Sequence, residues 1–274
     1  MPVVPPPSAT AAASAPLLEL RQLHLRRGTR AVFAGLDLRL DEPRIGLIGH
    51  NGAGKTSLLR LLCGLEQPHS GQVLSQGQDL HALPQGEQRA RRVGMMFQNP
   101  DDQIIFPTVE EELALSLQPQ GLARREALAR AREFLAARGL ADWAARAVGS
   151  LSQGQRQRVC WLALQLAGPR TLLLDEPFAS LDLPGRARLA DDMAACTQQL
   201  LVSTHVLEPV RHWPRVIWLD AGRVRGDGPG REVCAAYEAA VAEELAEEKA
   251  QKKTEDGVEE GAGEGAQAAM ALAA

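Results

Sequence analysis

The densest group of residues able to do chemistry lies at positions 49–56, where the chain reads Gly-His-Asn-Gly-Ala-Gly-Lys-Thr. This order fits the phosphate-binding loop pattern Gly-x-x-x-x-Gly-Lys-Ser/Thr. Glycines let successive backbone amides turn toward phosphate oxygens, and a helix starting at Lys55 would direct its positive end at the same group. Lys55 would neutralise the β- and γ-phosphates, and Thr56 would ligate Mg²⁺. We therefore expect a magnesium-bound nucleotide to be contacted by Gly49, His50, Asn51, Gly52, Ala53, Gly54, Lys55, Thr56 and Ser57.

Two acidic residues follow an apolar run further along the chain. Leu172, Leu173 and Leu174 read as a buried strand that ends in Asp175 and Glu176. Open α/β sheets bind ligands beyond the carboxyl ends of such strands. Taken alone, this could be a strand ending in two solvated acids. Beside the phosphate loop, Asp175 is expected in the Mg²⁺ shell and Glu176 as the group that polarises the attacking water.

The elements that must position these residues alternate between strand-like and helix-like patterns. Leu36, Leu38 and Leu40 alternate with polar residues, which is typical of a half-buried antiparallel strand. Short apolar runs alternating with helical patterns favour a mostly parallel sheet. We expect its strands at 44–48, 92–97, 171–175, 200–204 and 216–219, with a helix at 55–63 that ends at Gly64, and a hairpin at 71–80.

About sixty mainly helical residues follow the strand at 92–97. Thr108 and Glu111 have the spacing of a capping box, in which the Glu111 side chain would reach back to the amide of Thr108. Residues 124–138 have an amphipathic pattern that is closed by Gly139. These signals predict a helical insertion within the sheet.

Composition narrows the class of protein. The 274 residues are 45% hydrophobic and 23% charged, as in globular proteins, and no apolar run approaches the roughly 20 residues of a membrane-spanning helix. Ten acidic and three basic residues follow position 237, so this tail carries a charge of −7 and the nearly neutral body +3, which gives the net charge of −4. We therefore expect a soluble protein with no nucleic-acid partner. The four cysteines are scattered and are expected to be buried, reduced hydrophobes.

A further motif, Leu151-Ser152-Gln153-Gly154-Gln155, resembles the Leu-Ser-Gly-Gly-Gln signature of the ATP-binding-cassette (ABC) ATPases, from which Gln153 departs. Three residues match other motifs of that family in order. They are Gln98 of the Gln-loop, Asp182 in the D-loop Ser180-Leu181-Asp182, and the switch histidine His205. Each alone could be a surface amide, a helix N-cap or a strand-end histidine, but together they identify the family over residues 17–227.

The resemblance implies an α/β fold, with a P-loop NTPase (RecA-like) core of ABC ATPase type, an antiparallel β subdomain and a helical signature subdomain. We expect this domain at 17–230, with its helical part at about 99–165. Residues 1–16 would be a disordered extension. Residues 231–274 would form an acidic tail that is first helical and then disordered.

In this family two cassettes face each other head to tail, and ATP lies between the phosphate loop of one and the signature of the other. The resemblance implies three catalytic residues, namely Glu176, His205 and Gln98, and a Mg²⁺ ion held by Thr56, Gln98 and Asp175. Arg27 occupies the place of the aromatic residue that stacks on adenine. A guanidinium can also stack on a base, so weaker nucleobase selectivity is expected. Further ATP contacts would come from Ser152, Gly154, Gln155 and Asp182.

The stretch 97–112 resembles the ATPases of energy-coupling-factor transporters, which import vitamins and transition-metal ions. Residues 44–49 and 151–157 are most similar to the biotin systems, with cobalt or nickel uptake as the alternative. This implies a transmembrane coupling protein, a substrate-binding membrane protein and a second ATPase subunit, in a homodimer, on the cytoplasmic face of the bacterial cell membrane. A different class, a soluble regulatory ABC ATPase acting on nucleic acid or ribosomes, stays open.

Overall fold

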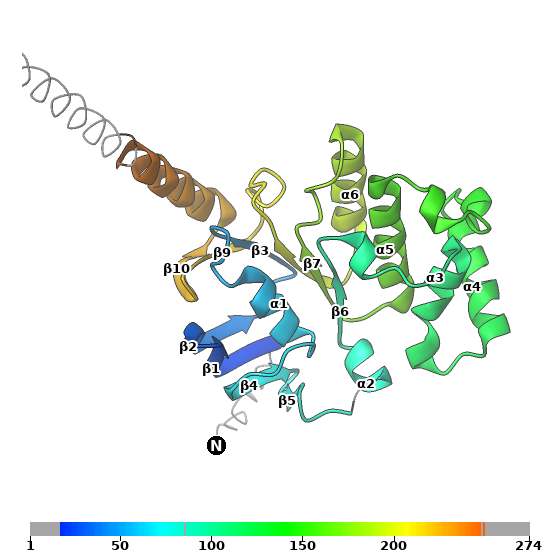
Figure 1. Cartoon of the computed structure of the whole chain (residues 1–274), viewed down its shortest axis with the longest axis horizontal. Coiled ribbons are helices and arrows are strands. Elements are labelled where there is room, and N and C mark those ends of the chain that lie inside the picture. Colours follow the sequence, from blue (N-terminus) through cyan, green and yellow to red (C-terminus); the bar gives the residue numbers. More distant parts are fainter. Residues whose placement is uncertain (1–16, 85, 248, 250–274) are drawn as a thin grey trace, which may run out of the picture.

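The structure, a computed structural model, describes residues 17–84, 86–247 and 249, which form two β-sheets with surrounding helices (Figure 1). The strands are β1 (Leu18–Arg27), β2 (Arg30–Leu40), β3 (Arg44–Ile48), β4 (Ser70–Ser75), β5 (Gln78–Asp79), β6 (Val93–Met96), β7 (Thr171–Asp175), β8 (Gln199–Ser203), β9 (Arg215–Asp220) and β10 (Arg223–Gly228). The helices are α1 (Lys55–Leu62), α2 (Glu87–Ala90), α3 (Val109–Leu115), α4 (Arg124–Ala136), α5 (Gln153–Ala167), α6 (Leu183–Ala195) and an unlabelled helix at 230–247. Short 3-10 turns are η1 (Pro100–Asp102), η2 (Gln118–Gln120), η3 (Ala141–Trp143) and η4 (Val148–Ser150).

The larger sheet has six strands in the order β10-β9-β3-β8-β7-β6. Its neighbours from β9 to β6 pair in parallel, and only β10 pairs antiparallel. The predicted mostly parallel sheet is therefore confirmed, and the strands expected at 44–48 and 171–175 coincide with β3 and β7. Because parallel strands end at a common edge, the phosphate loop after β3 and the acids after β7 lie at the same edge.

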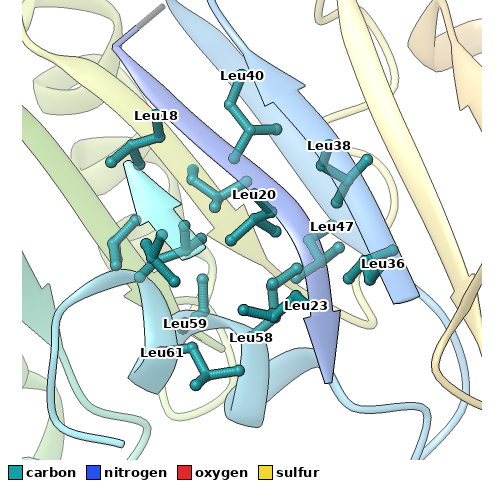
Figure 2. Packing of buried hydrophobic residues seen from close by; sticks show 14 of the residues in the cluster. Leu18, Leu20, Leu23, Leu36, Leu38, Leu40, Leu47, Leu58, Leu59 and Leu61 are labelled. Carbon is teal, nitrogen blue, oxygen red and sulfur yellow. The ribbon is translucent and has the colours of Figure 1, made fainter. Parts of the chain in front are cut away.

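The second sheet is antiparallel, in the order β2-β1-β4-β5. It packs its apolar face on α1 through a cluster of leucines, seen in Figure 2. Leu36, Leu38 and Leu40 of β2 are buried while Asp37 and Arg39 between them are exposed, as the alternation predicted. This core fixes α1, and with it the phosphate loop, between the two sheets.

The helical section has its own core. Val109, Leu113 and Val159 belong to a buried cluster that is distinct from those of the sheets, and Figure 1 shows α3, α4 and α5 to the right of β6 and β7, away from β1 and β2. The capping box predicted at Thr108 is wrong. The Thr108 hydroxyl donates to Glu111 Oε2 at 2.7 Å, while Arg124 holds the other oxygen of Glu111 at 3.1 Å, so the carboxylate is engaged elsewhere.

The ends of the chain fall partly beyond what the structure describes. The helix at 230–247 agrees with the expected helical start of the tail, whereas the disorder expected at 1–16 and at 257–274 lies outside the described residues. Across the residues that are described, no helix is both long enough and apolar enough to cross a bilayer. The domain limits given above stay predictions.

Candidate active site

The phosphate loop joins the end of β3 to the start of α1, and its glycines are required by geometry. Gly49 has φ +142°, and a Cβ added there would lie 2.1 Å from the carbonyl oxygen of Leu219 in β9. Gly54, with φ +106°, is the N-cap of α1 and offers no side-chain hydrogen bond. The first amides of α1 are thus left for a ligand, and the helix N-terminus favours an anion there.

Lys55 is buried at the base of this loop. Its ammonium donates to the carbonyl oxygens of Gly49 at 2.7 Å and His50 at 3.2 Å. Burial lowers the pKa of Lys55, and the nearby carboxylates of Glu176 and Asp175 oppose that effect. An ammonium held against the loop in this way can neutralise phosphate oxygens bound by the same amides.

Asp175, the last residue of β7, has the surroundings of a metal ligand. Its side chain is 3% exposed, and its Oδ1 atom is buried without a hydrogen-bond partner among the described residues. Leaving a buried oxygen unpaired is costly, so such an atom calls for a partner. Carboxylate and hydroxyl oxygens are ligands that Mg²⁺ prefers, and the Thr56 side chain lines the same cavity. The residues therefore fit a magnesium ion.

Glu176 follows in a strained conformation that fixes its carboxylate. Its φ of +49° is rare for a residue other than glycine, and its amide donates to the carbonyl oxygen of Ser203 at 2.8 Å. Oε2 of Glu176 accepts from the backbone amide of His205 at 3.1 Å and lies 2.7 Å from Nδ1 of the same residue. The pair can orient and deprotonate a water at the phosphate end of the site.

These residues surround one cavity of about 830 Å³, which we call the loop cavity. The predicted residues that line it are Arg27, Gly49, His50, Asn51, Gly52, Gly54, Lys55, Thr56, Ser57, Gln98, Asp175, Glu176 and His205. Ala53 does not line it. That residue is buried, and its amide donates to the carbonyl oxygen of His50 at 3.2 Å, so it shapes the turn of the loop.

The remaining predicted residues lie elsewhere. Ser152, Gly154, Gln155 and Asp182 line a second cavity of about 610 Å³, the signature cavity. Ser152 and Gln155 form a capping box at the start of α5, with bonds of 3.0 and 3.3 Å. Asp182 accepts from the amide of Gly185 at 2.8 Å as the N-cap of α6. A single chain therefore does not bring the signature to its own phosphate loop.

Comparison with known proteins decides the family. The ABC transporter family profile matches residues 35–179. The chain belongs to the ABC transporter family. A cassette of this family hydrolyses ATP, so the predicted enzyme activity is confirmed, and ATP is its nucleotide.

Relatives of this chain are named as ATP-binding proteins of transporters. The biotin transport ATP-binding protein BioM of Rhodobacter capsulatus is 44% identical over 82% of this chain and 95% of its own length. The energy-coupling factor transporter ATP-binding protein EcfA1 of Streptococcus pneumoniae is 36% identical over 69% of this chain and 70% of its own length. The structure of cbiO1 from Clostridium perfringens, part of the ABC transporter complex cbiONQ, superimposes with a TM-score of 0.70 at 23% identity, covering 84% of this chain and 95% of cbiO1. The predicted ABC ATPase fold is thereby confirmed.

Arg27 is the cassette residue that departs from the family pattern in the loop cavity. Its guanidinium forms an ion pair with Glu66 at 3.1 Å and remains half exposed. A guanidinium held by a carboxylate keeps its planar face available for stacking. The structure thus leaves Arg27 able to cover a nucleotide base.

Several residues that line or support the site were missed from the sequence, among them Tyr237 and Glu112. Tyr237, in the helix at 230–247, lines the loop cavity, and no local motif marks it, since its position depends on how that helix packs. Glu112 of α3 is buried, and its Oε2 accepts from the amides of Ile105 and Phe106, both at 2.9 Å. It fixes the loop that follows Gln98. A carboxylate at a buried position of an amphipathic helix was the available signal.

Proposed function

We propose that this cassette is the ATP-hydrolysing subunit of an energy-coupling-factor importer whose cargo is biotin. The similarity to BioM carries the proposal, because it spans 82% of this chain and 95% of that protein at 44% identity. The similarity to EcfA1 supports the same type of transporter. Cobalt or nickel is the alternative cargo.

The hydrolytic step is assigned to the residues of the loop cavity. Thr56, Gln98 and Asp175 would hold Mg²⁺, and the bound ion would shield the charge of the β- and γ-phosphates. Lys55 and the amides of the loop would bind the same phosphates. Glu176 would take a proton from the attacking water, with His205 held against it at 2.7 Å.

A second copy would complete the site. The signature cavity contains the Ser152 hydroxyl and the start of α5, which can contact a γ-phosphate bound in the other chain. ATP would close the dimer, and hydrolysis would remove the contact that holds it closed. The homodimer is preferred because one chain contains both halves of the site.

The proposed partners are a transmembrane coupling protein and a substrate-binding membrane protein. The cassette would lie peripherally on the cytoplasmic face of the cell membrane. The cargo would be bound by the membrane partner and would not touch this chain, so no residue of the cassette selects it.

Uptake in cells tests the cargo. We would measure labelled biotin, cobalt and nickel uptake in cells lacking this chain, restored with the wild type or with Lys55→Ala. Loss of biotin uptake that only the wild type restores is the expected result. Normal biotin uptake with reduced cobalt or nickel uptake would transfer the proposal to the metal. If none of the three depended on the chain, co-sedimentation with ribosomes or DNA would test the regulatory class.

A further inference from the structure

The helix at 230–247 packs beside the phosphate loop, at the end of β9 and β10 (Figure 1). Its first turns are anchored without any contribution from the loop. Val233 and Cys234 are buried in the apolar cluster of the large sheet, and Arg211 forms a bidentate ion pair with Glu238. The helix is therefore seated firmly, and it presents its next turns toward the loop.

Tyr237 joins this helix to the loop through a row of aromatic rings. Its ring lies 5.3 Å from that of Trp218, edge to face, and 5.4 Å from the ring of His50. Trp218 pairs with Ile48, the last residue before the loop, and His50 is the second residue of the loop. Tyr237 also lines the loop cavity itself. The only tyrosine of the chain thus touches the loop from the side of the helix.

Glu244, two turns further along, makes a second contact from the same face of the helix. Its Oε2 lies 3.2 Å from Nε2 of His50, in a contact that lacks hydrogen-bond alignment and is ionic only when the imidazole is protonated. Its other oxygen lies 3.9 Å from Arg225 of β10, whose guanidinium covers the Trp218 ring at 4.5 Å. Glu244 therefore connects the helix, β10 and the loop.

His50 is the point at which these contacts reach the nucleotide. The carbonyl oxygen of His50 accepts from Lys55, and that of Gly49 before it does so too. A shift of the His50 side chain would move the backbone that holds the ammonium. The phosphate end of the cavity is thus built partly by the helix at 230–247.

We propose that Tyr237 and Glu244 are positioning residues of the ATP site, which hold His50 and thereby set the affinity of the phosphate loop for MgATP. The inference rests on the assignment of the loop cavity as the nucleotide site. Because both residues act on the loop and leave Glu176 and His205 untouched, they affect binding and KM more than kcat.

Binding of a fluorescent MgATP analogue to the full chain, together with steady-state ATP hydrolysis, tests this. Tyr237→Ala should weaken binding and raise KM by about threefold to tenfold, the size of one aromatic contact, with little change in kcat. Tyr237→Phe should restore both values, since the ring makes the contacts. Glu244→Gln should weaken binding about twofold, as expected for an exposed ionic contact. The matched control is Glu243→Gln, which changes an exposed neighbouring carboxylate and should have no effect.

Tyr237→Ala with a native circular dichroism spectrum and wild-type affinity would overturn the inference. If that variant does not fold, the cycle of His50→Ala, Glu244→Gln and the double variant replaces it, and strictly additive effects would count against the coupling. Failure of the nucleotide site itself looks different, because wild type and Lys55→Ala would then bind the analogue equally.

Discussion

The two cavities each lie at the start of a helix, but the two helix starts are built in opposite ways. At α1 the N-cap is Gly54, which makes no side-chain bond, so the first amides have no side-chain cap from the residues that the structure describes. At α5 the N-cap is Ser152, and a complete capping box with Gln155 satisfies the amides of these two residues. The first helix start is shaped to receive phosphate oxygens. The second is partly capped by its own side chains, and it offers the hydroxyl hydrogen of Ser152 and the remaining amides of its first turn.

The two cavities also differ in how deeply their charged residues are buried. Lys55, Asp175 and Glu176 are all buried around the loop cavity, and burial lowers the pKa of the lysine. The signature cavity is lined by the exposed Ser152 and Asp182. Burying ionised groups is unfavourable for folding, so their presence in the loop cavity points to a function there. The exposed residues of the signature cavity carry no such penalty. The buried ionisable groups therefore lie in the loop cavity, and the signature cavity can act only on a ligand brought to it.

Changing the base of the loop cavity should have the largest effect. Glu176→Gln removes the proton acceptor, so kcat for ATP should fall by about 10²–10⁴, while MgATP binding persists because Lys55 and Asp175 remain. Steady-state hydrolysis and equilibrium binding measure the two quantities. Glu208→Gln, at an exposed carboxylate three residues after His205, should leave both unchanged. An unaltered rate in Glu176→Gln would remove this residue from the base role.

Mixing two inactive chains tests whether the cavities work together across a dimer. Lys55→Ala and Ser152→Arg should each abolish hydrolysis, but a mixture should regain activity, since about half of the dimers combine one intact loop with one intact signature. Lys55→Ala mixed with Ser152→Arg/Lys55→Ala serves as the control, because no dimer in it holds an intact loop. Mixed dimers that form without any recovery would mean that the signature does not complete the loop cavity.

Most of the predicted residues of the loop cavity could be found because they follow a strand whose apolar run is bounded by special residues. β3 stops at Gly49 and β7 stops at Asp175, and parallel pairing brings these ends to one edge. A functional residue at the end of one parallel strand thus predicts functional residues at the ends of the neighbouring strands. Of the thirteen predicted residues that line the cavity, ten follow from these strand ends, whereas Arg27, Gln98 and His205 were expected from the family resemblance.

What the sequence did not predict depends on contacts between distant segments. Thr108 and Glu111 have the local spacing of a capping box, but Arg124 of α4 binds the Glu111 carboxylate from the neighbouring helix. Tyr237 reaches the loop only because the helix at 230–247 packs against Trp218 of β9. The pattern of residues within one segment does not predict which other segment it packs against.

Glu112 gives a way to perturb the loop that follows Gln98 without changing a residue that lines the loop cavity. Glu112→Ala leaves the amides of Ile105 and Phe106 without their acceptor and should lower the free energy of unfolding by about 2–3 kcal/mol, as measured by chemical denaturation. Glu112→Gln, which keeps an acceptor oxygen, should cost less. Glu126→Gln, at an exposed position of α4, is the matched control and should be neutral. Equal stability of Glu112→Ala and wild type would show that the loop after Gln98 is held by other contacts.

The smallest effect is expected at the base end of the loop cavity, where Arg27 takes the place of an aromatic residue. Its guanidinium is oriented by Glu66 at 3.1 Å, so a stacking contribution of about 0.5–1 kcal/mol should be lost in Arg27→Ala, weakening ATP binding about twofold to fivefold. Arg26→Ala should have no effect, since neighbouring residues of a strand point to opposite faces. Arg27→Tyr tests the selectivity for the base, because an aromatic ring should increase the preference for ATP over GTP. If ATP affinity is the same in Arg27→Ala and wild type, the pair with Glu66 serves β1 alone, and base recognition lies with the backbone around the loop.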